Sequence, residues 1–122
     1  MITNRYHMIF DAENCQTKNW TEKGLEFLIE IIADKIDMNI LLGPYEAEGI
    51  PENPGMSGFS IIDFSHISVH TFTKSDEILI DVFSCKPFDS KKLYEFLKKD
   101  LNLEDKDIRS GLVDYNKLEK IQ

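Results

Sequence analysis

The sequence predicts an α+β fold, a two-layer α/β sandwich in which an antiparallel sheet carries two helices on one face. Helical patterns interrupt runs of strand patterns instead of alternating with every strand, which favours an antiparallel sheet. The chain has 122 residues, 42% of them hydrophobic and 30% charged, and this fits one globular domain over residues 1–122 with a modest core. The sheet face without helices must be polar or covered, and a second subunit would cover it.

The first half of the chain predicts a strand, a helix and a second strand. The apolar run Tyr6–Phe10 reads as the first strand. Thr21 is the expected N-cap of the helix, whose buried face repeats at the i, i+3, i+4 spacing. That face consists of Leu25, Leu28, Ile29, Ile32 and Ile36. Met38–Tyr45 predicts the next strand, and the Pro- and Gly-rich segment Glu46–Gly55 predicts a loop.

The second half predicts three strands, a helix and a last strand. The three strand patterns are Ser57–Phe64, His66–Phe72 and Glu77–Ser84. The segment Asp89–Leu101 predicts an amphipathic helix capped by Asp89 or Ser90. Its inner face would carry Leu93, Phe96, Leu97 and Leu101. Lys106–Tyr115 could form the last strand, which completes the order β-α-β-β-β-β-α-β.

Composition excludes several classes of partner. The formal net charge of -8 would repel phosphate backbones, so we expect no nucleic-acid partner. No stretch approaches the roughly 18 apolar residues of a membrane span, so we expect no membrane association. The two cysteines, Cys15 and Cys85, do not make a disulfide framework and are typical of thiols in a cytosolic, cytoplasmic protein.

The segment "DFSHISVHTF" gathers reactive side chains within one predicted strand. Alternate side chains of a strand share a face, so His66, Ser68 and His70 would lie on one face and Ser65 on the other. A short connection leads to the next strand, and a hairpin there could bring Cys85 near the start of this one. The segment is therefore the candidate site.

The residues alone leave three interpretations open. Two histidines and Cys85 could ligate zinc, but no fourth ligand is evident, so no metal is predicted. Cys85 could be a nucleophile activated by His70. The pattern by itself favours the third interpretation, a half-polar strand with Cys85 as a small core residue.

A family resemblance adds to these patterns. The run "SGFSIIDFSHISVHTF", followed by "DVFSC", resembles the S-adenosylmethionine decarboxylases in their short prokaryotic form, and "HMIFDAENC" is similar to that family's opening strand. The resemblance implies a pyruvoyl-dependent decarboxylase with an α/β sandwich fold. It further implies a homodimer of cleaved protomers whose active sites lie near the interface.

The resemblance also implies roles for four residues. The hydroxyl of Ser65 would attack the carbonyl of Phe64, and the chain would be cut between residues 64 and 65. Ser65 would then become the pyruvoyl cofactor, a ketone that accepts electrons through a Schiff base with the substrate amine. Ser57 and His70 would assist processing, and Cys85 would return a proton after CO2 leaves. The product would be the aminopropyl donor of spermidine synthesis.

Three positions depart from the family pattern, and all concern the substrate. Phe64 replaces the usual glutamate before the cleaved serine, Lys74 replaces a glutamate associated with the ribose hydroxyls, and Pro51 stands near the position of an aromatic residue that stacks on adenine. The favoured hypothesis is an S-adenosylmethionine decarboxylase with a rebuilt nucleoside pocket. The alternatives are a decarboxylase of ornithine or arginine, and an unprocessed, non-catalytic partner of an active paralogue.

Overall fold

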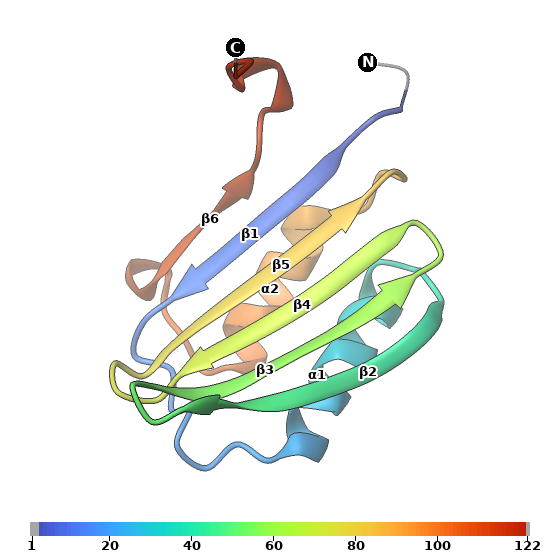
Figure 1. Cartoon of the computed structure of the whole chain (residues 1–122). Coiled ribbons are helices and arrows are strands. Elements are labelled where there is room, and N and C mark those ends of the chain that lie inside the picture. The colour runs from blue at the N-terminus through green and yellow to red at the C-terminus, as the bar shows by residue number, and fades with distance from the viewer. Residues whose placement is uncertain (1–2, 122) are drawn as a thin grey trace.

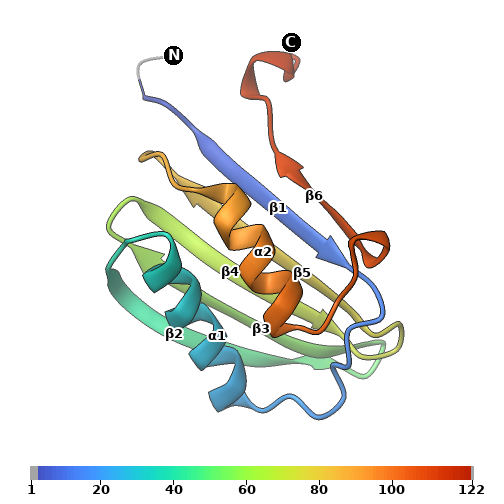
Figure 2. The ribbon, with the colours of Figure 1, turned by 180° about the vertical axis from the view of Figure 1, so that it is seen from behind.

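The computed structural model describes residues 3–121, which form one six-stranded antiparallel sheet with two helices packed on one face (Figures 1 and 2). The elements are β1 (Tyr6–Ala12), α1 (Glu22–Lys35), β2 (Ile40–Ile50), β3 (Asn53–Ile62), β4 (Ser65–Phe72), β5 (Glu77–Ser84), α2 (Ser90–Asp100), the 3₁₀ turn η1 (Asp105–Asp107), β6 (Ile108–Leu112) and the 3₁₀ turn η2 (Tyr115–Lys117). The strand order is β2-β3-β4-β5-β1-β6. The predicted fold class and element order are confirmed. None of the helices in residues 3–121 is long and apolar enough to cross a membrane.

Both helices begin at the residues that the sequence indicates. The hydroxyl of Thr21 accepts a hydrogen bond of 3.0 Å from the amide of Gly24 at the start of α1. The carboxylate of Asp89 accepts one of 3.0 Å from the amide of Lys92 at the start of α2. Each cap satisfies an amide that has no partner within its helix, so the two helix starts are fixed locally.

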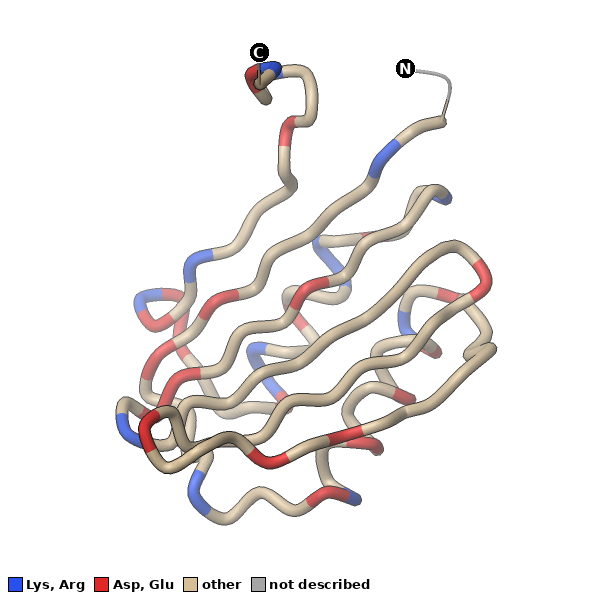
Figure 3. Tube along the Cα trace, in the orientation of Figure 1, with Lys and Arg blue, Asp and Glu red and all other residues tan. Residues whose placement is uncertain are grey.

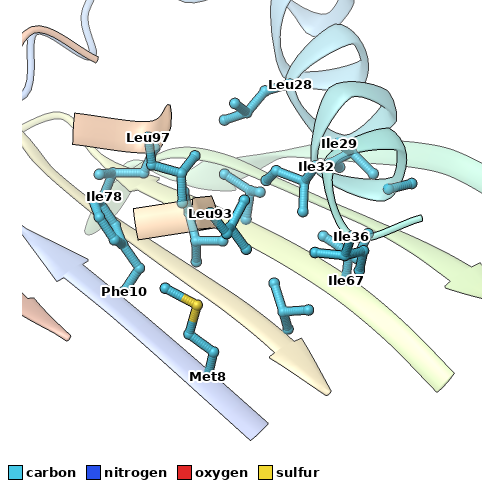
Figure 4. Close-up of a cluster of buried hydrophobic side chains, with 14 of the residues drawn as sticks. Met8, Phe10, Leu28, Ile29, Ile32, Ile36, Ile67, Ile78, Leu93 and Leu97 are labelled. Carbon is cyan, nitrogen blue, oxygen red and sulfur yellow. The ribbon is translucent and has the colours of Figure 1, made fainter. Parts of the chain in front are cut away.

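The hydrophobic core fills the space between the two helices and the sheet (Figure 4). Strand β5 alternates between half-buried and buried positions, so one of its faces points into the core and the other away from the helices. Phe10 on β1 and Ile67 on β4 are fully buried and meet the apolar faces of α1 and α2. The core therefore lies entirely on the helix side of the sheet.

Replacing Phe10 by alanine should destabilise the protein strongly. The Phe10 side chain is 0% exposed, and truncation of a buried phenylalanine costs about 3–5 kcal/mol of unfolding free energy. Phe27 on α1 is 63% exposed, so Phe27→Ala should change that free energy by no more than about 0.5 kcal/mol. Urea unfolding of both variants measures the difference, in chains that also carry Ser65→Ala so that the cleavage implied by the family resemblance cannot occur. Equal losses would contradict this placement of the core.

The prediction of a loop over Glu46–Gly55 is wrong. Strand β2 continues to Ile50, β3 begins at Asn53, and only the two residues between them form a turn. Gly55 has a φ of 148° and packs so closely on β4 that a Cβ there would collide with the carbonyl oxygen of Thr71. The glycine thus allows close strand packing, whereas the sequence pattern suggested a chain break.

The face of the sheet opposite the helices, here called the open face, is covered by no element of residues 3–121 (Figure 1). It carries exposed or half-buried apolar side chains among its polar ones. These apolar residues are Ile9, Tyr45, Phe59, Ile61, Leu79 and Phe83. Apolar groups on several adjacent strands make this face suited to contact with another surface.

Candidate active site

Ser65 is the first residue of β4 and follows a two-residue turn formed by Asp63 and Phe64. Two hydrogen bonds between Asp63 and Asn39 fix the turn. The backbone amide of Asp63 donates to the carbonyl oxygen of Asn39 at 2.9 Å, and the Asp63 carboxylate accepts from the Asn39 amide at 3.2 Å. Ser65 has a φ of 146°, which lies in a region that residues other than glycine rarely adopt. Such backbone strain costs on the order of 1–3 kcal/mol and is concentrated at functional sites.

Cys85 lies beside Ser65, as the hairpin argument from the sequence expected. Strand β5 pairs with β4 so that Ser84 stands opposite Ser65, and the next residue brings its Sγ to 3.5 Å from the Ser65 Oγ. The amide of Cys85 donates a 2.9 Å hydrogen bond to the carbonyl oxygen of Phe64. A donor on this oxygen polarises the carbonyl group that Ser65 would attack and stabilises the negative charge that would develop there.

Phe64, the departure from the family pattern, does not disturb this arrangement. Its ring is 40% exposed and lies beneath the ammonium group of Lys86, 5.2 Å from the ring centroid. This is a cation–π contact at the surface. The carbonyl oxygen of Phe64 still accepts the hydrogen bond from the Cys85 amide, while the Phe64 side chain contacts the ammonium group of Lys86.

Ser57 and His70 form a second pair. They stand opposite each other on β3 and β4, and the Ser57 Oγ lies 2.7 Å from the His70 Nδ1. Together with Tyr45 and Phe59 they line a shallow apolar pocket of about 210 Å³ on the open face. A serine hydrogen-bonded to an imidazole can exchange protons with a bound group.

The two pairs lie at opposite ends of β4. His70 follows Ser65 by five residues, which is about 16 Å along a strand. The hypothesis that His70 activates Cys85 is therefore wrong for a single chain, since Leu79 stands opposite His70 and Ser84 stands opposite Ser65. The interpretation of Cys85 as a core residue is also wrong, because its side chain is exposed.

The zinc interpretation gains no support either. Within residues 3–121, no group of three or more His, Cys, Asp and Glu side chains could hold a metal ion.

Lys74 lies in the turn between β4 and β5, with its Nζ 3.5 Å from the carbonyl oxygen of Glu52. Pro51 lines a cavity of about 350 Å³ that Trp20 also borders. Two of the three departures from the family pattern, Lys74 and Pro51, thus lie at the end of the sheet that carries Ser57 and His70.

A hydrogen-bonded group of side chains on the open face was not predicted from the sequence. The Nε2 of His7 lies 2.6 Å from Asp81 Oδ1, and its Nδ1 lies 2.7 Å from the Tyr115 hydroxyl. The Nε2 of His66 lies 4.0 Å from the same Asp81 oxygen. These residues come from β1, β4, β5 and η2, so only the folded sheet brings them together. The alternation of β1 and β5 could have placed His7 and Asp81 on the open face, but not in contact.

The two cysteines should differ sharply in reactivity. Burial in the core, with a smaller contribution from the charge of Asp76, raises the pKa of Cys15 to about 11, so little reactive thiolate forms near neutral pH. Cys85 is exposed. Iodoacetamide at mildly alkaline pH should therefore modify Cys85 in the folded protein and spare Cys15, as peptide mass spectrometry would show. Denaturation should make both react; equal labelling before denaturation would contradict the burial of Cys15.

Comparison with known proteins decides the family. The profile of the S-adenosylmethionine decarboxylase family matches residues 6–111. This chain belongs to the S-adenosylmethionine decarboxylase family. An S-adenosylmethionine decarboxylase proenzyme of Clostridium botulinum strain Loch Maree is 34% identical over 116 residues, covering 89% of this chain and 96% of the relative. The corresponding proenzyme of strain Hall is 33% identical over the same length. The family predicted from the sequence is confirmed.

A solved structure confirms the fold of this S-adenosylmethionine decarboxylase family member. The crystal structure of the adenosylmethionine decarboxylase from Aquifex aeolicus matches with a TM-score of 0.72 and 20% sequence identity, and the match covers 98% of this chain and 97% of that one. At this identity the likeness concerns the fold. The family name and the proenzyme relatives favour the S-adenosylmethionine hypothesis over the two alternatives.

Proposed function

We propose that this chain is a self-processing S-adenosylmethionine decarboxylase that cuts itself between Phe64 and Ser65. The observation that carries the proposal is the geometry at this bond. The Ser65 hydroxyl lies on a strained residue, the Cys85 amide donates to the carbonyl of Phe64, and the Cys85 thiol lies 3.5 Å from the hydroxyl. The family profile and the proenzyme relatives support the same conclusion.

Self-processing uses atoms of the chain alone, with one water. The Ser65 Oγ adds to the carbonyl carbon of Phe64, the C–N bond breaks, and an ester and a free amine result. Loss of the Ser65 α-proton then expels Phe64 as a carboxylate and leaves a dehydroalanine. Water hydrolyses this group, ammonia leaves, and the new chain begins with a pyruvoyl group. The Cys85 amide would hold the oxyanion during the first step.

The residues around Ser65 fit such a group. A pyruvoyl carbonyl supplies an electron acceptor for the carbon that loses CO2, which no ordinary side chain can provide. Cys85 lies within 3.5 Å of the Ser65 hydroxyl, so its thiol is placed to deliver a proton to that carbon. Its exposed position just after the end of β5 leaves access for a substrate.

We further propose that two protomers pair through their open faces. Ser57 and His70 are too far from Ser65 of their own chain to act on it, because they lie at the other end of the β3–β4 hairpin. A two-fold axis through the middle of the open face would bring this pair onto the partner's Ser65. The apolar side chains of the open face would be buried by the same contact. The site would then be composed of residues from both protomers.

Release of CO2 from carboxyl-labelled substrates tests the assignment. The purified protein, supplied with S-adenosylmethionine, ornithine and arginine in parallel, should release CO2 from S-adenosylmethionine and far less from the free amino acids. The matched control is the Cys85→Ala variant, which should still be cut but should turn over poorly. Release from ornithine or arginine alone would replace the proposed substrate, and no release from any of the three would support the non-catalytic alternative.

A further inference from the structure

Lys86 places a positive charge beside the bond proposed to be cut. Its ammonium group lies over the ring of Phe64, 5.2 Å from the ring centroid. Lys86 follows Cys85, whose amide donates a 2.9 Å hydrogen bond to the carbonyl oxygen of Phe64. The lysine therefore comes directly after a residue that already contacts the reacting carbonyl group.

A buried hydroxyl group fixes the backbone of Lys86 in this position. Ser84 is 0% exposed, and its Oγ donates to the Lys86 carbonyl oxygen at 2.7 Å and accepts from the Lys86 amide at 2.9 Å. Ser84 also stands opposite Ser65 in the register of β4 and β5. The start of the Lys86 side chain is thus held beside Ser65, whereas its flexible four-carbon stem leaves the ammonium free to move.

The ammonium of Lys86 meets an aromatic ring instead of an anion in the uncut chain. None of the ion pairs within residues 3–121 includes Lys86. Figure 3 shows an acidic position in the turn between β3 and β4 and a basic position in the loop after β5. The acidic residue is Asp63, and its two carboxylate oxygens accept hydrogen bonds of 3.2 Å from Asn39. Because Phe64 is uncharged, Lys86 stays available for a group that cleavage creates.

Cleavage creates a carboxylate at Phe64. In the elimination step described above, the bond between the Ser65 Cβ and its oxygen breaks, and the electron pair stays on that oxygen. The α-proton of Ser65 passes to a base, for which the composite site offers the partner's His70, and a double bond forms between Cα and Cβ. Phe64 leaves with a full negative charge. This charge arises on the residue whose ring already lies beneath the ammonium of Lys86.

We propose that the Lys86 ammonium stabilises this carboxylate as it forms and thereby speeds the elimination step. The inference rests on the function proposed above, because it needs a cut between Phe64 and Ser65. The Cys85 amide serves one oxygen of the Phe64 carboxyl group, and Lys86 would serve the other, which Ser65 contributes. An ammonium that meets a neutral ring before the step and an anion during it favours the transition state over the starting chain, and this difference is what accelerates a reaction.

Pulse–chase labelling of the full-length chain in the expressing cells tests the proposal, because it follows the loss of the uncut form. Lys86→Met keeps an apolar stem over Phe64 and removes the charge, so the uncut form should disappear about tenfold more slowly than in the wild type. Lys86→Arg keeps the charge and should be cut within about threefold of the wild-type rate. An unchanged rate in Lys86→Met would overturn the proposal, and so would equal slowing in Lys86→Arg.

Lys35→Met is the matched control. The Lys35 ammonium lies over the ring of Phe96, 4.8 Å from the ring centroid, in a second contact between a lysine and a phenylalanine, which joins the two helices. This variant removes the same charge and the same type of contact away from the Phe64–Ser65 bond, so its cleavage rate should equal that of the wild type. Equal slowing in both variants would indicate a general effect of charge or stability and would overturn the role of Lys86.

Hydroxylamine separates a lost elimination step from a chain that fails to fold. It attacks an ester and spares peptide bonds under mild conditions, so it cuts a chain in which the Ser65 oxygen already carries the acyl group of Phe64. The uncut Lys86→Met chain should yield residues 1–64 ending in a hydroxamate and residues 65–122 beginning with a free serine amine. A chain that hydroxylamine leaves whole has formed no ester, and this result would overturn the assignment of Lys86 to the elimination step.

Failure of this inference can be distinguished from failure of the proposed function. A wild-type chain that stays uncut, and that hydroxylamine also leaves whole, contradicts the proposed function. A wild-type chain that is cut, together with a Lys86→Met chain that is cut equally fast, contradicts the role of Lys86 alone.

Discussion

Ser65→Ala should abolish both self-cleavage and decarboxylation, leaving a single 14.2 kDa chain under all conditions. The variant keeps the turn and the amide donor of Cys85 but lacks the oxygen that attacks the Phe64 carbonyl. Without that oxygen no ester forms, and no electron-accepting carbonyl can arise. Intact mass spectrometry and CO2 release are the two measurements.

Ser75→Ala is the matched control for this experiment. Ser75 lies in the turn between β4 and β5, at the far end of the strand from Ser65, and is exposed. Ser75→Ala also removes one serine hydroxyl from the β4–β5 hairpin, but not the hydroxyl that would attack Phe64, so this variant should be cut and active. Cleavage that persisted in Ser65→Ala would show that the scissile bond or its nucleophile has been assigned wrongly.

Co-expression of two inactive variants should restore cleavage to one of them. The Ser65→Ala chain keeps His70 but lacks the attacking hydroxyl. The His70→Ala chain keeps the attacking hydroxyl of Ser65 but lacks the imidazole. In a mixed dimer with the proposed composite site, Ser65 of the His70→Ala chain lies next to His70 of the Ser65→Ala chain. The His70→Ala chain should therefore be cut only when the two are made together, while the Ser65→Ala chain stays intact.

Different tags on the two chains allow intact mass to assign each product and affinity capture to confirm mixed dimers. Mixed dimers without any cleavage would contradict the composite site. Full cleavage of His70→Ala made alone would show that this histidine is not required. The effect is close to all-or-none because the two pairs lie about 16 Å apart within one chain.

Local patterns predicted the elements well where one face of an element is buried. The apolar spacing of α1 and its cap at Thr21 are dictated by residues within one or two turns of each other, so the sequence contains them directly. The alternation of β5 is similarly local, and the predicted bounds of Glu77–Ser84 are those of the structure. The prediction for the segment from Glu46 to Gly55 failed because Gly55 serves a close contact with Thr71 of β4, which no local pattern reveals.

The candidate site also has a part that the sequence could predict, which is local, and a part that it could not, which depends on tertiary contacts. The motif around Ser65 is contiguous, so a resemblance could identify it and the neighbouring strand could supply Cys85. The separation of the Ser57–His70 pair from Ser65 follows from the strand register, which no single segment specifies. The contact of His7 with Tyr115 joins residues 108 positions apart and depends on β1 lying between β5 and β6.

The order of strands also bears on the cleaved protein. Strand β1 would belong to the fragment before the proposed cut, yet it lies between β5 and β6, which would belong to the fragment after it (Figure 1). Both fragments therefore contribute to one sheet, and we expect them to stay together under native conditions.

Intact mass of the purified wild-type chain, measured after denaturation, tests the central claim most directly. We expect two fragments, residues 1–64 ending in a free carboxylate and residues 65–122 beginning with a pyruvoyl group in place of an amine. Amino-terminal sequencing should fail on the second fragment because its end is blocked. A single uncut 14.2 kDa species would contradict self-processing at Phe64–Ser65 and the decarboxylase mechanism built on it.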